Sequence, residues 1–199
     1  MAKRLFDVFF SGLGLLILSP LLIIFALIIK LTSPGPVFYR GTRIGKNFRP
    51  FRIFKFRTMV ISAEKIGGPS TREEDPRVTK IGKFLRKYKL DEFPQLINVF
   101  RGEMSLVGPR PEVPEYANLY QGEEKIVYTV KPGMTDYASL WNIDEGGALK
   151  NAENTEETEK IYLEEIRPEK VRLQMKYVET RSFMLDLKIV IKTILKVFH

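Results

Sequence analysis

The chain has 199 residues, of which 32 are basic and 24 acidic, so its formal net charge is +8. It has no cysteine, which excludes disulfides, a thiol nucleophile and a cysteine-based zinc site, and its one histidine is His199. Catalysis is therefore expected from carboxylates, Lys, Arg, hydroxyls or backbone groups, and a metal site from oxygen ligands, which favours Mg²⁺, Mn²⁺ or Ca²⁺. The excess of positive charge indicates an anionic partner: nucleic acid, a membrane surface or a phosphorylated substrate.

The N-terminal segment is long and apolar. Residues 8–29 contain no charged side chain and lie between Asp7 and Lys30. As a straight helix this stretch is about 33 Å long, which is enough to cross a bilayer. Ser19 and Pro20 lie near its middle and predict a kink, because Pro20 lacks an amide donor. The Ser19 hydroxyl is placed to satisfy a carbonyl that the kink leaves free.

The charges around this segment leave two topologies open. Lys3 and Arg4 precede it and Lys30 follows it. Positively charged flanks prefer the cytosol. Both flanks reach the cytosol if the helix enters the membrane and turns back, whereas a single kinked span would separate them. Sequence physics alone gives these two topologies equal weight.

The run Ser33–Pro34–Gly35–Pro36 marks a boundary, which predicts a membrane-associated segment over 1–35 and a second unit over 36–199. Residues 37–39 and 51–56 have strand-like patterns, with a turn signal at 45–47 between them. We therefore expect a small β-hairpin.

The rest of the chain has mainly helical patterns. Residues 66–75 are polar and turn-rich and predict a loop, whereas 79–88 predict an amphipathic helix with a basic face. That helix lies on the membrane interface or packs on the core. Further helices are expected over 96–100, ended by Gly102, over the acidic stretch 153–165, and from Pro168 to the C-terminus. The last one has a strongly apolar end that lies on the membrane or packs on the core. The predicted fold class is α+β, mainly helical with a small β-hairpin.

Two adjacent acids, Asp91 and Glu92, occupy the expected start of a helix. Asp91 is at the predicted N-cap, and Pro94 falls in the first turn, where its missing amide does no harm. Free amides and the helix dipole stabilise both acids as anions. An ionised carboxylate can act as a nucleophile or a Mg²⁺ ligand, although an ordinary acidic cap has the same pattern.

Arg110 lies between Pro109 and Pro111. Two prolines restrict the backbone on either side of it, and a rigidly presented guanidinium suits bidentate binding of phosphate. A structural turn with an exposed arginine is the alternative for this motif in isolation.

Taken in order, the motifs resemble those of the small monotopic phosphoglycosyl transferases, bacterial sugar transferases that begin glycan assembly on polyprenyl phosphate. The matching runs are KRLFD at 3–7, SP at 19–20, GPVF at 35–38, FKFRTM at 54–59, DPRVTKIG at 75–82, LDEFPQLINV at 90–99, GEMSLVGPRP at 102–111 and KPGMT at 131–135. They cover most of the first 135 residues, and such an ordered series is specific.

The resemblance implies a helix that re-enters the membrane, broken at Ser19–Pro20, with amphipathic interfacial helices beside it. It places the catalytic domain on the cytosolic face of the bacterial inner membrane. The implied reaction moves a phospho-sugar from a UDP-sugar to polyprenyl (undecaprenyl) phosphate and releases UMP, as the first membrane step of glycan assembly. The implied partners are UDP-sugar, polyprenyl phosphate, membrane lipids and downstream glycosyltransferases, with no nucleic acid.

The resemblance also assigns roles to residues. Asp91 is the implied nucleophile, forming a covalent aspartyl-phosphosugar, and Glu92 is its Mg²⁺-binding partner, so that both acids hold the metal. Lys55, Arg86 and Arg110 match basic positions that hold phosphates.

The chain departs from the commonest family pattern after Thr135. The run from Met134 to Glu145 lacks a recurrent arginine, so no nucleotide- or sugar-binding residue is assigned there. Tyr137 and Trp141 offer flat rings for stacking, but core packing is the expected role.

The alternative function is a membrane-anchored basic module that binds nucleic acid or anionic lipid without catalysis. Its binding region is the aromatic and basic block 38–57. This alternative gives no reason for Asp91–Glu92 or for the prolines around Arg110.

Overall fold

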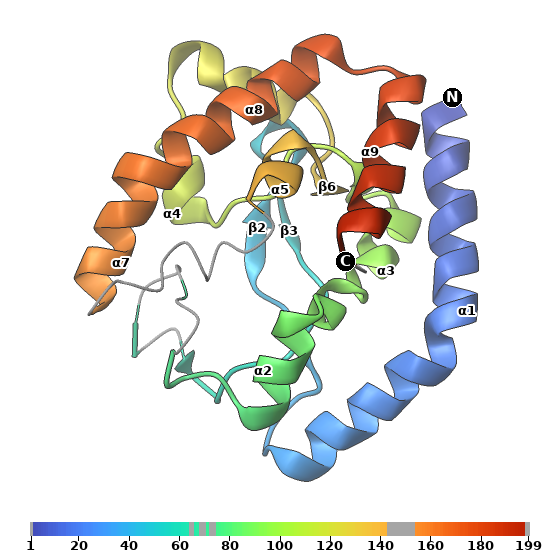
Figure 1. Ribbon diagram of the computed structural model, residues 1–199, viewed down its shortest axis with the longest axis vertical. Coiled ribbons are helices and arrows are strands. Elements are labelled where there is room, and N and C mark those ends of the chain that lie inside the picture. The colour runs from blue at the N-terminus through green and yellow to red at the C-terminus, as the bar shows by residue number, and fades with distance from the viewer. Residues whose placement is uncertain (1, 64–65, 68–70, 72–74, 143–153, 198–199) are drawn as a thin grey trace.

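The computed structural model describes residues 2–63, 66–67, 71, 75–142 and 154–197. These residues form a mainly helical fold with three small two-stranded sheets, which confirms the expected α+β class (Figure 1). The predicted loop 66–75 lies mostly outside the described residues, as does position 153 at the start of the predicted acidic helix.

The elements follow one another in this order: α1 (Ala2–Thr32), β1 (Phe38–Tyr39), β2 (Thr42–Ile44), η1 (Lys46–Phe48), β3 (Pro50–Arg52), β4 (Lys55–Phe56), α2 (Lys80–Lys87), η3 (Leu90–Glu92), α3 (Gln95–Arg101), β5 (Ser105–Val107), α4 (Pro114–Ala117), η4 (Gly122–Thr129), β6 (Gly133–Thr135), α5 (Tyr137–Trp141), α7 (Thr155–Ile161), η5 (Tyr162–Ile166), α8 (Arg167–Thr180) and α9 (Phe183–Val197).

Helix α1 runs along one side of the molecule and bends midway (Figure 1), with Pro20 inside it. The Ser19 hydroxyl donates to the Leu16 carbonyl at 2.8 Å. That carbonyl is the one an amide at position 20 would have served, so the expected compensation for the proline is confirmed. In its most apolar stretch, only 11% of the residues are buried by the rest of the fold. A long helix with this much exposed apolar surface is suited to a membrane anchor.

Both ends of α1 contact the same folded unit. Near its start, the Arg4 guanidinium donates to the carbonyls of Val99 at 2.7 Å and Phe100 at 2.8 Å, at the end of α3. Near its end, Ile29 is fully buried in a cluster with Phe56. The two halves of α1 therefore pack against the same folded unit.

The predicted hairpin is confirmed. Strands β2 and β3 pair antiparallel, with Arg43 opposite Phe51, and η1 turns the chain between them. Strands β1 and β4 extend the same arrangement, with Tyr39 opposite Lys55. Lys55 therefore lies on a strand whose position is fixed by pairing with β1.

Helix α2 begins where the sequence predicts. The Thr79 hydroxyl caps it by accepting the Gly82 amide at 3.0 Å. A Cβ at Gly82 would lie 2.0 Å from the Thr58 carbonyl oxygen, so glycine is required for this close approach. Leu85 is buried, whereas Phe84 remains exposed, so the apolar face of α2 packs only partly on the core.

The N-cap prediction for Asp91 is wrong. Lys89 adopts a left-handed conformation with φ of 55° and begins a separate 3₁₀ turn, η3, that contains both acids. Helix α3 starts only at Gln95, after Pro94, and ends at Gly102 as expected. Asp91 therefore precedes the helix by a full turn and does not cap it.

The single helix predicted after Pro168 is also wrong, because the chain breaks between α8 and α9. Arg181 is extended, and Ser182 caps α9 by accepting the Leu185 amide at 3.2 Å. Along α9, Ile189 is 1% exposed whereas Leu195 is 57% exposed. One face of α9 thus packs on the core and the other remains apolar and uncovered.

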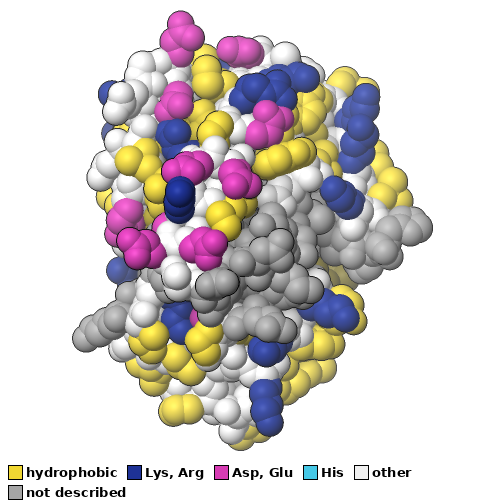
Figure 2. All heavy atoms as spheres, turned by 60° about the vertical axis from the view of Figure 1, so that its left-hand side comes forward, with side chains coloured by type: hydrophobic (Ala, Val, Ile, Leu, Met, Phe, Trp, Pro, Cys, Tyr) yellow, Lys and Arg dark blue, Asp and Glu magenta, His cyan; other side chains and the backbone are white. Residues whose placement is uncertain are grey.

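The acidic helix is confirmed for its described part. Helix α7 continues through one π-helical turn, η5, into α8. Figure 2, which brings this side of the molecule forward, shows acidic side chains gathered on the upper part of that surface. The inner face of the η5 turn is buried, however: the Tyr162 ring stacks on Tyr116 with centroids 4.6 Å apart.

Candidate active site

Three predicted site residues meet directly, from three separate elements. Glu92 in η3 receives the Lys55 ammonium of β4, with Nζ 2.8 Å from Oε1. The Arg110 guanidinium, beyond β5, grips the same carboxylate with both ends: Nη1 lies 3.0 Å from Oε2, and Nη2 donates to Oε1. Arg110 thus forms a bidentate contact with a carboxylate, and the predicted binding of phosphate stays a prediction.

Burial and the neighbouring charges shift the pKa values of this cluster. Burial alone would raise the pKa of Glu92, but the charges and hydrogen bonds of Arg110 and Lys55 hold it well below its usual range. Burial lowers the pKa of Lys55 more than Glu92 restores it. Glu92 is therefore a fixed anion that orients two cations.

Asp91 differs from its neighbour. Its side chain is buried, at 7% exposure, and it makes no hydrogen bond or ion pair with the residues that the structure describes. Burial raises its pKa, and the nearby Lys55 charge opposes that rise. Asp91 does not cap α3, because Pro94 occupies the N-cap position of that helix. Asp91 is instead a buried carboxylate with capacity for an incoming electrophile or cation.

Arg86 stands apart from the Glu92 cluster. Its Nε donates to the Thr58 hydroxyl at 2.9 Å, and its positive charge opposes the rise that burial causes in the pKa of Asp91. The site thus joins Lys55, Glu92 and Arg110 by contact, with Asp91 beside them and Arg86 within electrostatic range.

The two acids differ in how many oxygens they would offer to a metal ion. Asp91 retains free oxygens, whereas Glu92 already accepts from two cations. Among the described residues, no group of three or more potential side-chain ligands is gathered. Mg²⁺ is commonly held by one or two carboxylates together with substrate phosphates, and the Asp91 oxygens would supply one such carboxylate.

Sequence reasoning missed two residues of α3. Asn98 is fully buried, and its Oδ1 accepts the Phe54 amide at 2.8 Å while its Nδ2 donates to the Arg52 carbonyl at 3.0 Å. It therefore fixes the hairpin strand just before Lys55. Gln95 is buried on the same helix, one turn earlier. Two amides three positions apart among apolar residues were the available signal.

A buried polar network behind Arg110 was also missed. The Gln174 side chain donates to the Arg110 carbonyl at 3.4 Å, and Lys170 pairs with Glu112 at 2.8 Å. Lys170 also donates to the Tyr162 hydroxyl at 3.0 Å. The spacing of four between Lys170 and Gln174 puts both on one face of α8. This face backs the loop that presents Arg110.

Removing one charge of this network should destabilise the protein. Glu112→Gln is expected to lower the free energy of unfolding by about 3 kcal/mol, because Lys170 stays buried without this counter-charge. Chemical denaturation in detergent measures the change. The double variant Glu112→Gln/Lys170→Met should regain most of the loss.

The matched control is Glu169→Gln, which breaks the exposed pair with Arg172 on the same helix. Exposed pairs contribute little, so this variant should unfold like the wild type. A Glu112→Gln variant no less stable than the control would show that the buried pair has no stabilising role.

The expected packing role of Trp141 is wrong, because 46% of its surface is exposed at the end of α5. Tyr137 does pack, with its ring set edge-on to Tyr177. Residues 143–145, at the end of the divergent stretch, lie outside the described residues.

Comparison with known proteins finds sugar transferases, both as a family and as individual relatives. The sequence model of the bacterial sugar transferase family matches residues 1–199. The UDP-glucose:undecaprenyl-phosphate glucose-1-phosphate transferase of Escherichia coli strain K12 is 39% identical over 98% of this chain and 40% of its own length. The Aeromonas hydrophila UDP-N-acetylgalactosamine-undecaprenyl-phosphate N-acetylgalactosaminephosphotransferase is 36% identical over 96% of this chain and 42% of its own.

A shorter relative is covered more fully. The exopolysaccharide production protein ExoY of Rhizobium meliloti is 37% identical over 98% of this chain and 84% of its own length. The chain therefore spans about two fifths of the length of the larger relatives and most of the smaller one. With a match over its whole length, the chain belongs to the bacterial sugar transferase family.

Proposed function

We propose that the protein transfers a phospho-sugar from a UDP-sugar to polyprenyl phosphate and releases UMP. The observation that carries this proposal is the buried Asp91 carboxylate, unpartnered among the described residues, next to Glu92 held by Lys55 and Arg110. Relatives named for sugar-1-phosphate transfer to undecaprenyl phosphate support it. The lipid-linked product is a substrate for glycosyltransferases that act downstream.

The chemistry proceeds in two displacements at phosphorus. An Asp91 oxygen attacks the sugar-bearing phosphorus, the bond to UMP breaks, and UMP leaves with the electron pair. An oxygen of polyprenyl phosphate then attacks the same phosphorus and releases the Asp91 carboxylate. The sugar–oxygen bond is never broken, so the anomeric configuration is retained. Two steps also let a soluble donor and a lipid acceptor use one nucleophile in turn.

The surrounding residues supply what phosphoryl transfer needs, which is positioning and charge neutralisation. Glu92 orients Lys55 and Arg110, whose remaining N–H donors bind phosphate oxygens, and Arg86 adds a further positive charge. Mg²⁺ held by Asp91 and Glu92 would neutralise charge on the bound phosphates.

The membrane arrangement follows from α1. Because Arg4 and Ile29, near its two ends, both contact one folded unit, we infer that residues 1–35 re-enter the membrane and do not cross it. The unit 36–199 then lies on the cytosolic face of the inner membrane, as positively charged flanks favour. The exposed apolar faces of α2 and α9 contact lipid beside it.

Cysteine labelling tests this topology directly, because the chain has no native cysteine. Ala2→Cys and Pro36→Cys should both react with an impermeant maleimide only from the cytosolic side of membrane vesicles. Glu123→Cys, exposed on the second unit, is the control that identifies that side. Labelling of positions 2 and 36 from opposite sides would contradict re-entry.

The alternative of a basic binding module is less well supported, because several basic residues of the block 38–57 are engaged within the fold, whereas Lys46, Arg49 and Arg52 are exposed. Arg40 covers the Phe54 ring at 3.4 Å, Arg57 donates to the Ser33 carbonyl at 2.8 Å, and Lys55 is paired with Glu92. These side chains are poorly available to a nucleic acid.

The direct test is UMP release by protein held in nanodiscs, using a panel of UDP-sugars with Mg²⁺. We expect release from one sugar to require polyprenyl phosphate for turnover and to stop on chelation. Absence of UMP with every sugar, in protein shown to be folded, would overturn the proposed function.

A further inference from the structure

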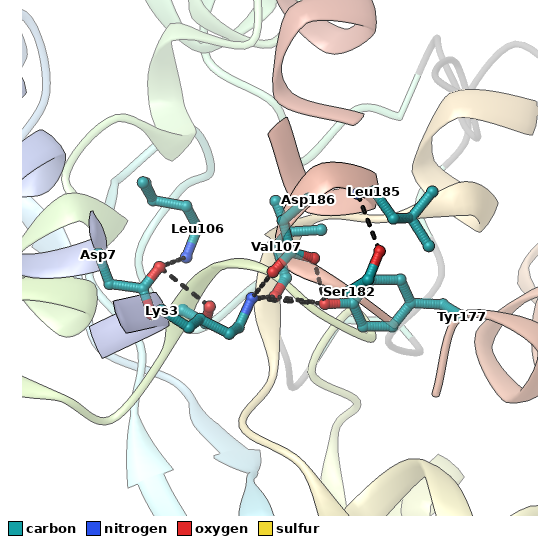
Figure 3. Close-up of polar contacts among 9 residues, drawn as sticks. Lys3, Asp7, Leu106, Val107, Tyr177, Ser182, Leu185 and Asp186 are labelled. Atoms are coloured by element: carbon teal, nitrogen blue, oxygen red, sulfur yellow. Dashed lines mark hydrogen bonds and ion pairs between the residues drawn. The ribbon is translucent and has the colours of Figure 1, made fainter. Parts of the chain in front are cut away.

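The first turns of α1 bind the strand that leads to Arg110. The Asp7 Oδ1 accepts the Leu106 amide at 3.0 Å and the Ser105 hydroxyl at 3.1 Å. The Lys3 ammonium donates to the Val107 carbonyl at 3.0 Å. Figure 3 shows both side chains of α1 turned toward this strand. All three residues of β5 are therefore held from the membrane helix.

The far edge of β5 is fixed as well. Strand β6 pairs with it in parallel, with Ser105 opposite Gly133. A Cβ at Gly133 would lie 2.1 Å from the Gly108 amide nitrogen, so the two strands approach closely. The chain then passes through Gly108 and Pro109 to Arg110. Strand β5 is thus hydrogen-bonded on both edges, to α1 and to β6. Because the Arg110 loop starts where β5 ends, these contacts fix the starting point of the loop.

The same contacts join α1 to the C-terminal helices. Lys3 pairs with Asp186 of α9, and the Tyr177 hydroxyl of α8 lies 2.7 Å from Asp186 Oδ1 and 3.1 Å from the Val107 carbonyl (Figure 3). Asp7, Tyr177 and Asp186 are all at most 3% exposed. Burying such groups costs desolvation energy, and the proposed chemistry makes no direct use of them.

We propose that Lys3 and Asp7 are positioning residues, through which the seated membrane helix sets the place of Arg110 against Glu92. The supports of the Arg110 loop include β5, which α1 holds, and Gln174, which bonds the Arg110 carbonyl from α8. Strand β6 adds hydrogen bonds to Gly108 and Pro109. Loss of the contacts from α1 removes one of these supports, so the guanidinium is placed less accurately against Glu92. The kinetic part of this inference rests on the proposed function.

The kinetic test compares Asp7→Ala with Asp7→Asn in nanodiscs. Misplacement of a positioned group by about 1 Å costs about 100-fold, so Asp7→Ala should lower kcat for UMP release by about 10- to 100-fold. KM for the UDP-sugar should change by less than about threefold, since Lys55 and Arg86 remain in place. Asp7→Asn keeps the acceptor oxygen and should recover most of kcat.

The matched control is Ser11→Ala. Ser11 is fully buried in the same helix, but its hydroxyl donates only to Val8 of α1 among the described residues. This variant should keep the wild-type kcat. Equal losses in Asp7→Ala and Ser11→Ala, or in Asp7→Ala and Asp7→Asn, would assign Asp7 a general structural role and overturn the inference.

Hydrogen exchange provides a readout that needs no activity. Amides of residues 105–108 should exchange faster in Asp7→Ala than in the wild type, and Ser11→Ala should leave them protected. This arm still tests the inference if the wild type releases no UMP from any donor. If Asp7→Ala does not fold, Lys3→Met is measured in the same way. Unchanged protection and kcat in the folded variant would refute the proposal.

Discussion

Replacing Asp91 with asparagine is expected to abolish UMP release from a UDP-sugar while leaving the fold intact. Asparagine has the same shape but lacks the anionic oxygen that would attack phosphorus. We expect the rate to fall by at least about 10³-fold, as for other covalent nucleophiles. Stability should not fall, because Asp91 is buried without a partner among the described residues and burial raises its pKa.

Mass spectrometry distinguishes the possible roles of Asp91. Wild-type protein given UDP-sugar without acceptor should gain the mass of one phospho-sugar on the peptide that contains Asp91, and Asp91→Asn should gain none. Glu169→Gln, on the exposed face of α8, is the control and should form the adduct normally. Turnover without any trapped adduct would instead favour Asp91 as a general base acting with both substrates bound.

Glu92→Gln should produce the second large effect. The carboxylate accepts hydrogen bonds from both Lys55 and Arg110, and its charge offsets theirs in a mostly buried position. Glutamine keeps the volume but loses the charge and one of the two acceptor oxygens. We expect kcat to fall by about 100- to 1,000-fold, which is the scale of losing one preorganised electrostatic group. The Mg²⁺ concentration needed for half-maximal rate should rise.

The matched control is Glu103→Gln. Glu103 accepts from the Asn98 amide at 2.7 Å, beyond the other end of α3, and among the described residues it forms no ion pair with Lys55 or Arg86. The comparison is made by steady-state UMP release across a Mg²⁺ titration. If Glu92→Gln and Glu103→Gln lose activity equally, with the same Mg²⁺ dependence, the proposed role of Glu92 is wrong.

Much of the local structure follows from neighbours along the chain. Pro20 removes a donor and Ser19 replaces it, Thr79 caps α2, and Gly102 ends α3 with φ of 86°. Each of these features depends on residues within about one helical turn, so sequence reading is sufficient. The residue types of the site, adjacent carboxylates together with Lys and Arg, can likewise be identified from the sequence.

Other features depend on segments that only the fold brings together. The sequence places Asp91 and Glu92 side by side, yet Glu92 is paired with Lys55, 37 positions away, while Asp91 has no partner among the described residues. The N-cap expected at Asp91 failed because Lys89 turns left-handed and inserts η3 before α3. The local sequence pattern does not indicate which of the two adjacent acids will pair with cations from distant parts of the chain.

The sequence by itself thus determined the family, the residue types of the site and most helix limits. The tertiary structure alone decided the break between α8 and α9, the support of Arg110 by Gln174, and the contact of Asp7 with Leu106, 99 positions away. Burial and pairing of polar groups are set by which distant surfaces pack together. In a single sequence, the only sign of such buried polar pairs is a polar residue on an otherwise apolar face.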